Sequence, residues 1–103
     1  MPSRDFKRSD RIADLIKVEI SEVLYSEVKD PRVQGITVLN VTLTPDMRKA
    51  DIFISQTNSF NEIDTEELIK GLEKAKGFIR KKLSQNLNLR RIPEIFFEIE
   101  DFF

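Results

Sequence analysis

In the stretch KGLEKAKGFIRKKLSQNLNLRRIP, from Lys70 to Pro93, a helical pattern gives way to a strand. Apolar residues recur every three or four positions up to Leu87, which is the spacing of one buried helix face. Gly77 interrupts the pattern, and glycine costs about 1 kcal/mol relative to alanine inside a helix. Pro93 cannot continue a helix. The stretch therefore predicts a helix that is kinked or broken at Gly77, followed by a last strand, EIFFEIE, after Pro93.

The same stretch is the most basic part of a chain whose formal net charge is −1. Residues 70–91 hold eight Lys and Arg against Glu73 alone, a local charge of +7 that leaves −8 for the remainder. At about 100° per residue, the apolar side chains gather on one face of the helix. The opposite face carries Lys70, Lys74, Gly77 and Lys81.

The missing side chain at the centre of this basic face has two interpretations. Gly77 would let a phosphate backbone approach closely between lysines, and a second helix starting there would offer free N–H groups to phosphate. Alternatively, the lysines form an ordinary solvated face, and Gly77 only relieves crowding or ends a helix. Composition alone leaves both interpretations open.

The remaining pattern predicts a helix and a hairpin before this stretch. We expect an amphipathic helix over residues 9–28, and its buried face comprises Ile12, Leu15, Ile16, Ile20, Val23 and Leu24. Pro31 disfavours helix at the preceding residue and ends it. ITVLNVTL (36–43) and ADIFISQT (50–57) are typical of strands, and the short turn TPDMRK between them implies an antiparallel hairpin. The sum is an α+β domain, with helices packed on one face of a three-stranded sheet.

Composition excludes several classes of function. The chain has 103 residues with no Cys and no His, which removes disulfides, thiolate metal sites and the commonest general base. No Gly-rich phosphate loop is present, so we expect no enzymatic activity, no metal and no cofactor.

We expect a single domain over residues 1–103, with a short basic segment at 1–8 and no C-terminal extension. No apolar run could span a bilayer and the N-terminus lacks the apolar centre of a secretory signal, so we expect a cytoplasmic protein without membrane contact.

Three pieces of the sequence resemble the ribosome-binding factor A family, a type II KH-like fold. They are DPR at 30–32, VTLTPDMRKADIFIS at 41–55 and KGFIRKKLSQNLNLRRIPEIFF at 76–97. KH domains clamp nucleic acid with a Gly-x-x-Gly turn between two helices. This chain instead has Ala75-Lys76-Gly77 at the helix junction, which resembles the Ala-x-Gly interruption of that family. The resemblance covers nearly the whole chain and implies the order α-β-β-α-(kink)-α-β.

The resemblance also implies a function. Members of this family bind the small (30S) ribosomal subunit, assist late maturation and processing of 16S rRNA, and are linked to growth in the cold. The implied partners are the small subunit and its 16S rRNA, together with other assembly factors. The implied state is a monomer, and no catalysis is attributed to the fold.

On this basis, the candidate rRNA-binding residues are the basic side chains of the helix and its exit, with those at the N-terminus. They are Lys70, Lys74, Lys76, Gly77, Arg80, Lys81, Lys82, Arg90 and Arg91, together with Arg4, Lys7, Arg8 and Arg11. Two subsets have another interpretation. Arg90 and Arg91 could meet the last carbonyls of the helix, and the N-terminal group could be a solvated terminus partly neutralised by Asp5 and Asp10.

Other interpretations remain. The same basic face could bind an acidic protein partner, which would make the chain a protein-interaction module, and a generic KH RNA binder is a third alternative without the usual clamp. Phe53, Phe96 and Phe97 could stack on bases, although a three-stranded sheet must bury one face and core packing is favoured. We expect Phe6, Phe60 and Phe78 to be packing residues as well.

Overall fold

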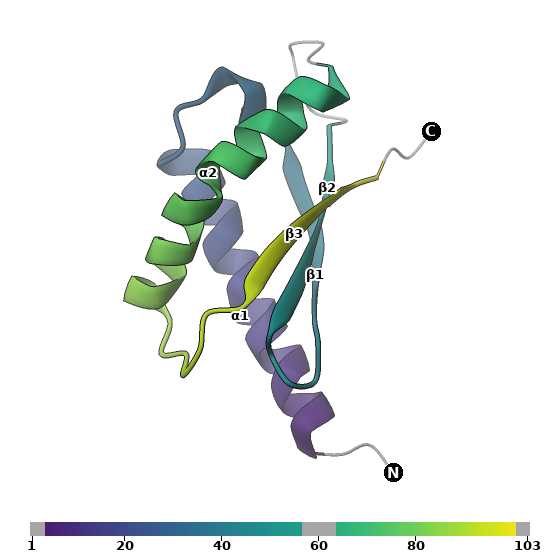
Figure 1. Ribbon diagram of the computed structural model, residues 1–103, viewed down its shortest axis with the longest axis vertical. Coiled ribbons are helices and arrows are strands. Elements are labelled where there is room, and N and C mark those ends of the chain that lie inside the picture. The colour runs from purple at the N-terminus through teal and green to yellow at the C-terminus, as the bar shows by residue number, and fades with distance from the viewer. Residues whose placement is uncertain (1–3, 57–63, 101–103) are drawn as a thin grey trace.

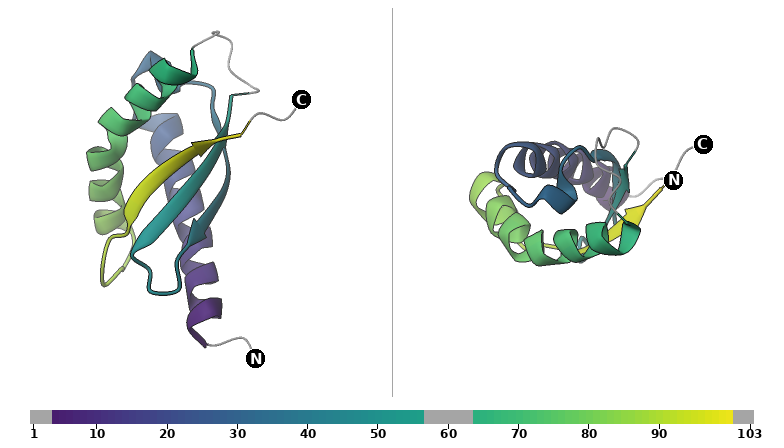
Figure 2. Two further views of the ribbon diagram at one scale, coloured as in Figure 1. Left: turned by 45° about the vertical axis from the view of Figure 1, so that its right-hand side comes forward. Right: turned by 90° about the horizontal axis from the view of Figure 1, so that it is seen from above.

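The computed structural model describes the backbone of residues 4–56 and 64–100, and the side chains from residue 8 onward within these ranges. Two long helices lie on one side of a sheet (Figures 1 and 2). The elements are α1 (Arg4–Ser26), the short 3-10 helix η1 (Pro31–Val33), β1 (Thr37–Leu43), β2 (Lys49–Ser55), α2 (Thr65–Asn86) and β3 (Glu94–Ile99). The predicted α+β class, with helices on one face of a three-stranded sheet, is confirmed.

The sheet has the order β1-β2-β3 and is mixed. β1 and β2 form the predicted antiparallel hairpin, with a bulge between Val38 and Asn40. β2 and β3 are parallel, with Lys49 opposite Glu94 at one end and Ile54 opposite Ile99 at the other. Parallel neighbours cannot be joined by a tight turn, so the chain returns through α2 before it enters β3.

The helix-facing side of the sheet holds the core. Strand side chains alternate between faces, and Ala50, Ile52 and Ile54 of β2 are fully buried. Both helices contribute to the same cluster; its fully buried members on α1 and α2 include Ile16, Ile20, Leu68, Leu72, Ile79 and Leu83. Leu15 is an exception to the predicted buried face, because its side chain is 53% exposed on the outer side of α1.

The other face of the sheet is open, and its charged residues are acidic except for Lys49. Asp51 of β2 lies on this face, as do Glu94 and Glu98 of β3, by the same alternation. Phe96 lies between the two glutamates in sequence and is 36% exposed, so it is not a core residue. Phe97, on the opposite parity, packs against the core as predicted.

α2 is one continuous helix from Thr65 to Asn86, so of the two alternatives predicted at Gly77, a kink or a break, the break into two helices is wrong. Its axis bends instead (Figure 1; Figure 2, right). The energetic reason is that Leu72 and Ile79 are both fully buried, and burying each such side chain contributes about 1.5–3 kcal/mol. The cost of about 1 kcal/mol for glycine is too small to separate the two halves.

A second glycine, Gly71, fixes the position of η1 against α2. A Cβ atom at this position would lie 3.0 Å from Val33 Cγ1 and 3.1 Å from Arg32 Cβ. Val33 is buried, so the contact is part of the core. At Gly77, by contrast, an added Cβ would meet nothing within 4 Å. The close packing of the η1 side chains therefore favours glycine at position 71, whereas no contact does so at position 77.

The two glycines should respond oppositely to the same substitution. Gly77→Ala should raise the free energy of unfolding by about 0.5–1 kcal/mol, because alanine is the better helix former and its methyl group is unhindered. Gly71→Ala should lower it by about 1 kcal/mol, because crowding against Val33 outweighs the same gain in helix propensity. Urea unfolding of the two variants measures both values. Equal stabilisation by the two substitutions would contradict the packing role of Gly71.

Candidate nucleic-acid interface

The outer side of α2 forms a continuous basic surface, which we call the α2 basic face: Lys70, Lys74, Gly77 and Lys81. All four residues are exposed, opposite the buried Leu72, Ala75, Ile79 and Leu83, as the helical spacing predicts. Lys70 lies 3.5 Å from Glu67 in an exposed ion pair. Lys74 and Lys81 make no ion pair with any residue that the structure describes. The face therefore offers two uncompensated ammonium groups on either side of an open glycine.

Three other basic residues of α2 have partners inside the molecule. Lys76 pairs with Glu73 at 2.6 Å and lies 5.7 Å from the ring centroid of Phe96. Arg80 donates a hydrogen bond of 3.2 Å to the backbone carbonyl of Ile92. Lys82 pairs at 3.0 Å with Glu27, the residue that follows α1. These side chains hold neighbouring elements in place, and a phosphate would compete with those contacts.

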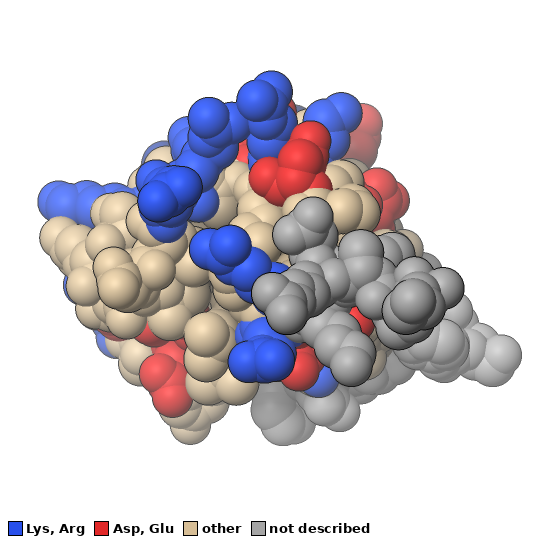
Figure 3. Space-filling model, turned by 90° about the horizontal axis from the view of Figure 1, so that it is seen from below, with Lys and Arg blue, Asp and Glu red and all other residues tan. Residues whose placement is uncertain are grey.

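A second group of cations surrounds a hollow at one end of the molecule, which we call the terminal groove. It has a volume of about 510 Å³, and its basic lining residues are Arg8, Arg48, Arg90 and Arg91. They come from α1, from the β1–β2 turn and from the α2–β3 loop, which meet at this end (Figure 1). Viewed from below, Lys and Arg side chains gather along one side of this end and across its centre (Figure 3).

The β1–β2 turn holds Arg48 in place through its own hydrogen bonds. The Asp46 carboxylate accepts from the Thr44 hydroxyl at 2.7 Å and from the Arg48 backbone N–H at 3.1 Å. The first of these bonds is the main reason that the pKa of Asp46 is lowered. Met47 adopts a left-handed conformation, with φ of 63°, which is uncommon for a residue other than glycine or asparagine. The sequence-based set omits Arg48, because only the fold brings this turn beside Arg90 and Arg91.

Of the four basic candidates near the N-terminus, the structure describes the side chains of two, Arg8 and Arg11. α1 begins at Arg4, so the helix extends far enough to group these residues as the spacing requires. Arg8 and Arg11 are exposed, and Arg8 lines the terminal groove. The side chains of Arg4 and Lys7 lie outside the described residues. Ala75, the first residue of the predicted junction motif, is buried in the core and positions α2 rather than a ligand.

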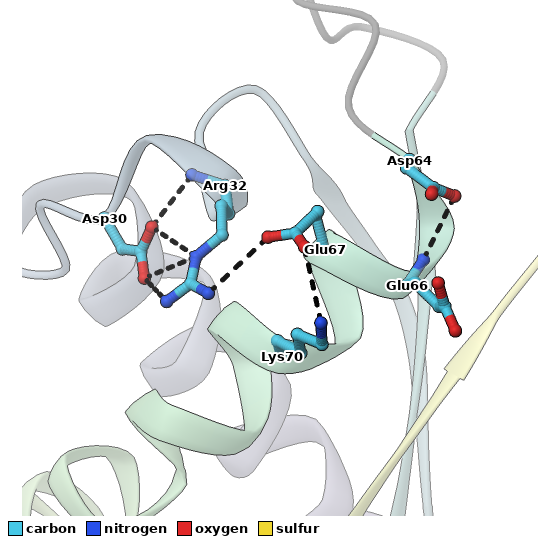
Figure 4. Close-up of polar contacts among 6 residues, drawn as sticks. All are labelled: Asp30, Arg32, Asp64, Glu66, Glu67 and Lys70. Carbon is cyan, nitrogen blue, oxygen red and sulfur yellow. Dashed lines mark hydrogen bonds and ion pairs between the residues drawn. The ribbon is translucent and has the colours of Figure 1, made fainter.

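The DPR segment forms a polar clamp between η1 and α2 (Figure 4). Asp30 caps η1 by accepting the Arg32 backbone N–H at 3.0 Å, and the same carboxylate accepts from the Arg32 guanidinium at 2.7 Å. Arg32 also lies 3.8 Å from Glu67 of α2. The side-chain hydrogen bond from Arg32 is the main cause that lowers the pKa of Asp30 to about 2. Arg32 is therefore committed to holding η1 on α2.

Within residues 4–56 and 64–100, no three acidic side chains gather in a way that could hold a metal ion. Over the same ranges, no helix has both the length and the apolar character needed to cross a membrane.

These elements define a small α+β protein with a mixed three-stranded sheet and two basic surfaces. Within that class, the chain belongs to the ribosome-binding factor A family, whose model matches residues 8–103. A relative of that name from Syntrophus aciditrophicus (strain SB) is 42% identical over 98 residues, which are 95% of this chain and 78% of the relative.

Solved structures agree with the fold. The crystal structure of ribosome-binding factor A from Thermus thermophilus is similar with a TM-score of 0.77 at 20% identity, covering 88% of this chain and 93% of that one. A homology model of Thermus thermophilus ribosome-binding factor A has also been fitted into a cryo-EM map of a 30S complex. Those coordinates match with a TM-score of 0.69 at 20% identity, over 87% of this chain and 92% of that chain.

The Asp30–Arg32 pair should make stability depend on pH. Because the pKa of Asp30 falls from 3.8 to about 2 on folding, the charged pair stabilises the fold above pH 4 and loses this contribution as pH falls from about 4 to 2. Asp30→Asn keeps an acceptor for the cap but removes the charge. It should cost about 1 kcal/mol at pH 7, since partial exposure screens the pair.

Unfolding of wild type and Asp30→Asn by urea at pH 7, 5, 4 and 3 measures this difference. Asp14→Asn, at an exposed position on α1, is the matched control and should change stability by less than about 0.5 kcal/mol. A deficit for Asp30→Asn that stays the same at pH 3 as at pH 7 would contradict the assignment.

Proposed function

We propose that this protein binds the small ribosomal subunit through 16S rRNA and assists late maturation of that RNA, including its processing. The observation that carries the proposal is the separation between paired and unpaired cations. Apart from Lys70, the cations of the two surfaces form no ion pair with a described residue; they are Lys74, Lys81, Arg8, Arg48, Arg90 and Arg91. A surface of this kind suits the sugar–phosphate backbone, which is bound mainly through Lys and Arg.

Two further points support the proposal. Gly77 leaves open space at the centre of the α2 basic face, so a phosphate group could lie close to the helix backbone. The Thermus thermophilus relative has been placed in a complex with a 30S subunit. A factor that acts on ribosomal subunits works in the cytoplasm, and binding requires no cofactor. We also propose that the protein acts as a monomer alongside other assembly factors and that it has a role in growth in the cold.

Binding should be electrostatic, with a measurable salt slope. For four to six phosphate contacts, log Kd should change with log salt by roughly 3 to 5, at about 0.7–0.9 per phosphate. The double variant Lys74→Ala/Lys81→Ala should reduce this slope by about 1.4–1.8, and Arg48→Ala by about 0.7–0.9. Sedimentation with purified small subunits and with full ribosomes over a salt series measures the slopes.

Lys17→Ala, on α1 and outside both surfaces, is the matched control and should leave the slope unchanged. Absence of binding to small subunits at low salt would overturn the proposal. Ribonuclease treatment tests the alternative, because a complex that survives digestion of the RNA would identify an acidic protein as the partner of these surfaces.

Substitution of Gly77 should separate stability from binding. Gly77→Ala stabilises the helix but places a methyl group where the phosphate backbone is expected to approach, so subunit binding should weaken severalfold. Gly77→Leu should weaken binding further, because its side chain is larger. The same sedimentation assay and urea unfolding give the two readouts. Unchanged binding by both variants would mean that no ligand approaches the helix closely at this position.

A further inference from the structure

An open groove lies on the side of α2 that faces η1, and we call it the η1 groove. It has a volume of about 530 Å³ and is bounded by the end of α1, by η1 and by α2. Val28 and Ala75 are buried residues on its lining, and Gly71 contributes no side chain. Gly71 is in close contact with Val33 and Arg32 of η1, and Ala75, one helical turn further along α2, adds only a methyl group to the lining. The volume of the groove lies within the range of about 300–1,000 Å³ for small-molecule sites.

Phe78 borders the η1 groove and is 40% exposed, contrary to its predicted role in packing. The Lys82 ammonium lies 5.5 Å from the centroid of its ring. The same ammonium is held by Glu27, which directly follows α1, so the ring and the cation form a pair on α2 that is anchored to the end of α1. A partly exposed aromatic ring beside an apolar hollow is the arrangement on which nucleobases stack.

The charges around the groove favour an anionic ligand. Its two acidic side chains are already compensated, because Glu27 pairs with Lys82 and Asp30 pairs with Arg32. The clamp at its margin is visible in Figure 4. Lys29 and Lys74 also line the groove and make no ion pair with any described residue. The uncompensated charge at the rim is therefore positive.

The groove is continuous with the α2 basic face. Lys74 belongs to both surfaces, and Phe78 directly follows Gly77 in the helix. A strand whose phosphates lie along that face would carry its bases next to the groove. Proteins recognise RNA mainly where bases are unpaired and can be stacked on aromatic rings.

We propose that the η1 groove takes one unpaired nucleobase of the RNA bound along the α2 basic face. The base stacks on Phe78, and Lys74 contacts the phosphate of the same nucleotide. This inference rests on the proposed function and adds to it a specific site for a base, beside a surface that otherwise binds only backbone.

The test compares two labelled RNA probes that differ only in the base. One is a single-stranded hexamer of adenylate, and the other has the same sugar–phosphate chain with all bases removed. Fluorescence anisotropy should show that wild type binds the base-bearing hexamer about 5- to 150-fold more tightly, the range expected for stacking of one base. Phe78→Ala and Phe78→Leu should lose this preference, whereas Phe78→Tyr should keep it.

Two comparisons separate the groove from the basic surfaces. Phe96→Ala removes a phenylalanine of similar exposure on the open face of the sheet, and it should leave the preference intact. Lys74→Ala should weaken binding of both probes and reduce the salt slope, whereas the Phe78 variants should leave the salt slope for small subunits unchanged.

Equal affinity of wild type for the two probes would overturn the inference while leaving salt-dependent subunit binding intact. Loss of subunit binding in Phe78→Ala without any preference between the probes would also overturn it, in favour of a protein segment in the groove. Failure of the proposed function is distinguishable, because wild type would then bind neither small subunits nor either probe at low salt.

Discussion

The parallel pairing of β2 with β3 is the constraint on which both basic surfaces depend. The ladder begins where the Glu94 N–H donates to the Arg48 carbonyl at 2.8 Å. Because β3 must run in the same direction as β2, α2 has to carry the chain back along the length of the sheet. The loop that follows α2 therefore ends beside the β1–β2 turn. Arg90 and Arg91 meet Arg48 for this topological reason, although more than 40 residues separate them along the chain.

Within that topology, packing decides which cations can meet a ligand. Lys82 connects α2 to the segment that follows α1, and Arg32 connects η1 to α2, so both use their charge inside the molecule. The contact of Gly71 with η1 sets how closely these elements approach, and so it sets the width of the groove beside Phe78. Lys74 and Lys81 remain unpaired among the described residues. A basic side chain that lies close to an acidic residue of another segment is therefore used to hold the fold together, whereas one that does not can bind a ligand.

The sequence predicts the fold well where the pattern is local. Helical spacing identifies the buried and basic faces of α2, and the apolar runs on either side of a short turn identify the hairpin. It does not distinguish the two glycines, because the crowding at Gly71 comes from Val33 on another segment. It also cannot place Arg48 beside Arg91, since this depends on the parallel ladder. The predicted break at Gly77 is wrong because the local penalty of glycine is smaller than the gain from burying Leu72 and Ile79 on either side.

The open face of the sheet adds a consequence for association kinetics. Asp51, Glu94 and Glu98 outnumber Lys49 on that face, whereas basic residues predominate on the α2 basic face and around the terminal groove, so charge is unevenly distributed despite a net charge of only −1. In the field of a polyanion, such a molecule is turned before contact, and its acidic side is held away. A larger fraction of collisions then leads to binding than the net charge would suggest. Added salt weakens this effect, because charges separated by more than the Debye length, about 10 Å at 0.1 M, are largely screened from one another.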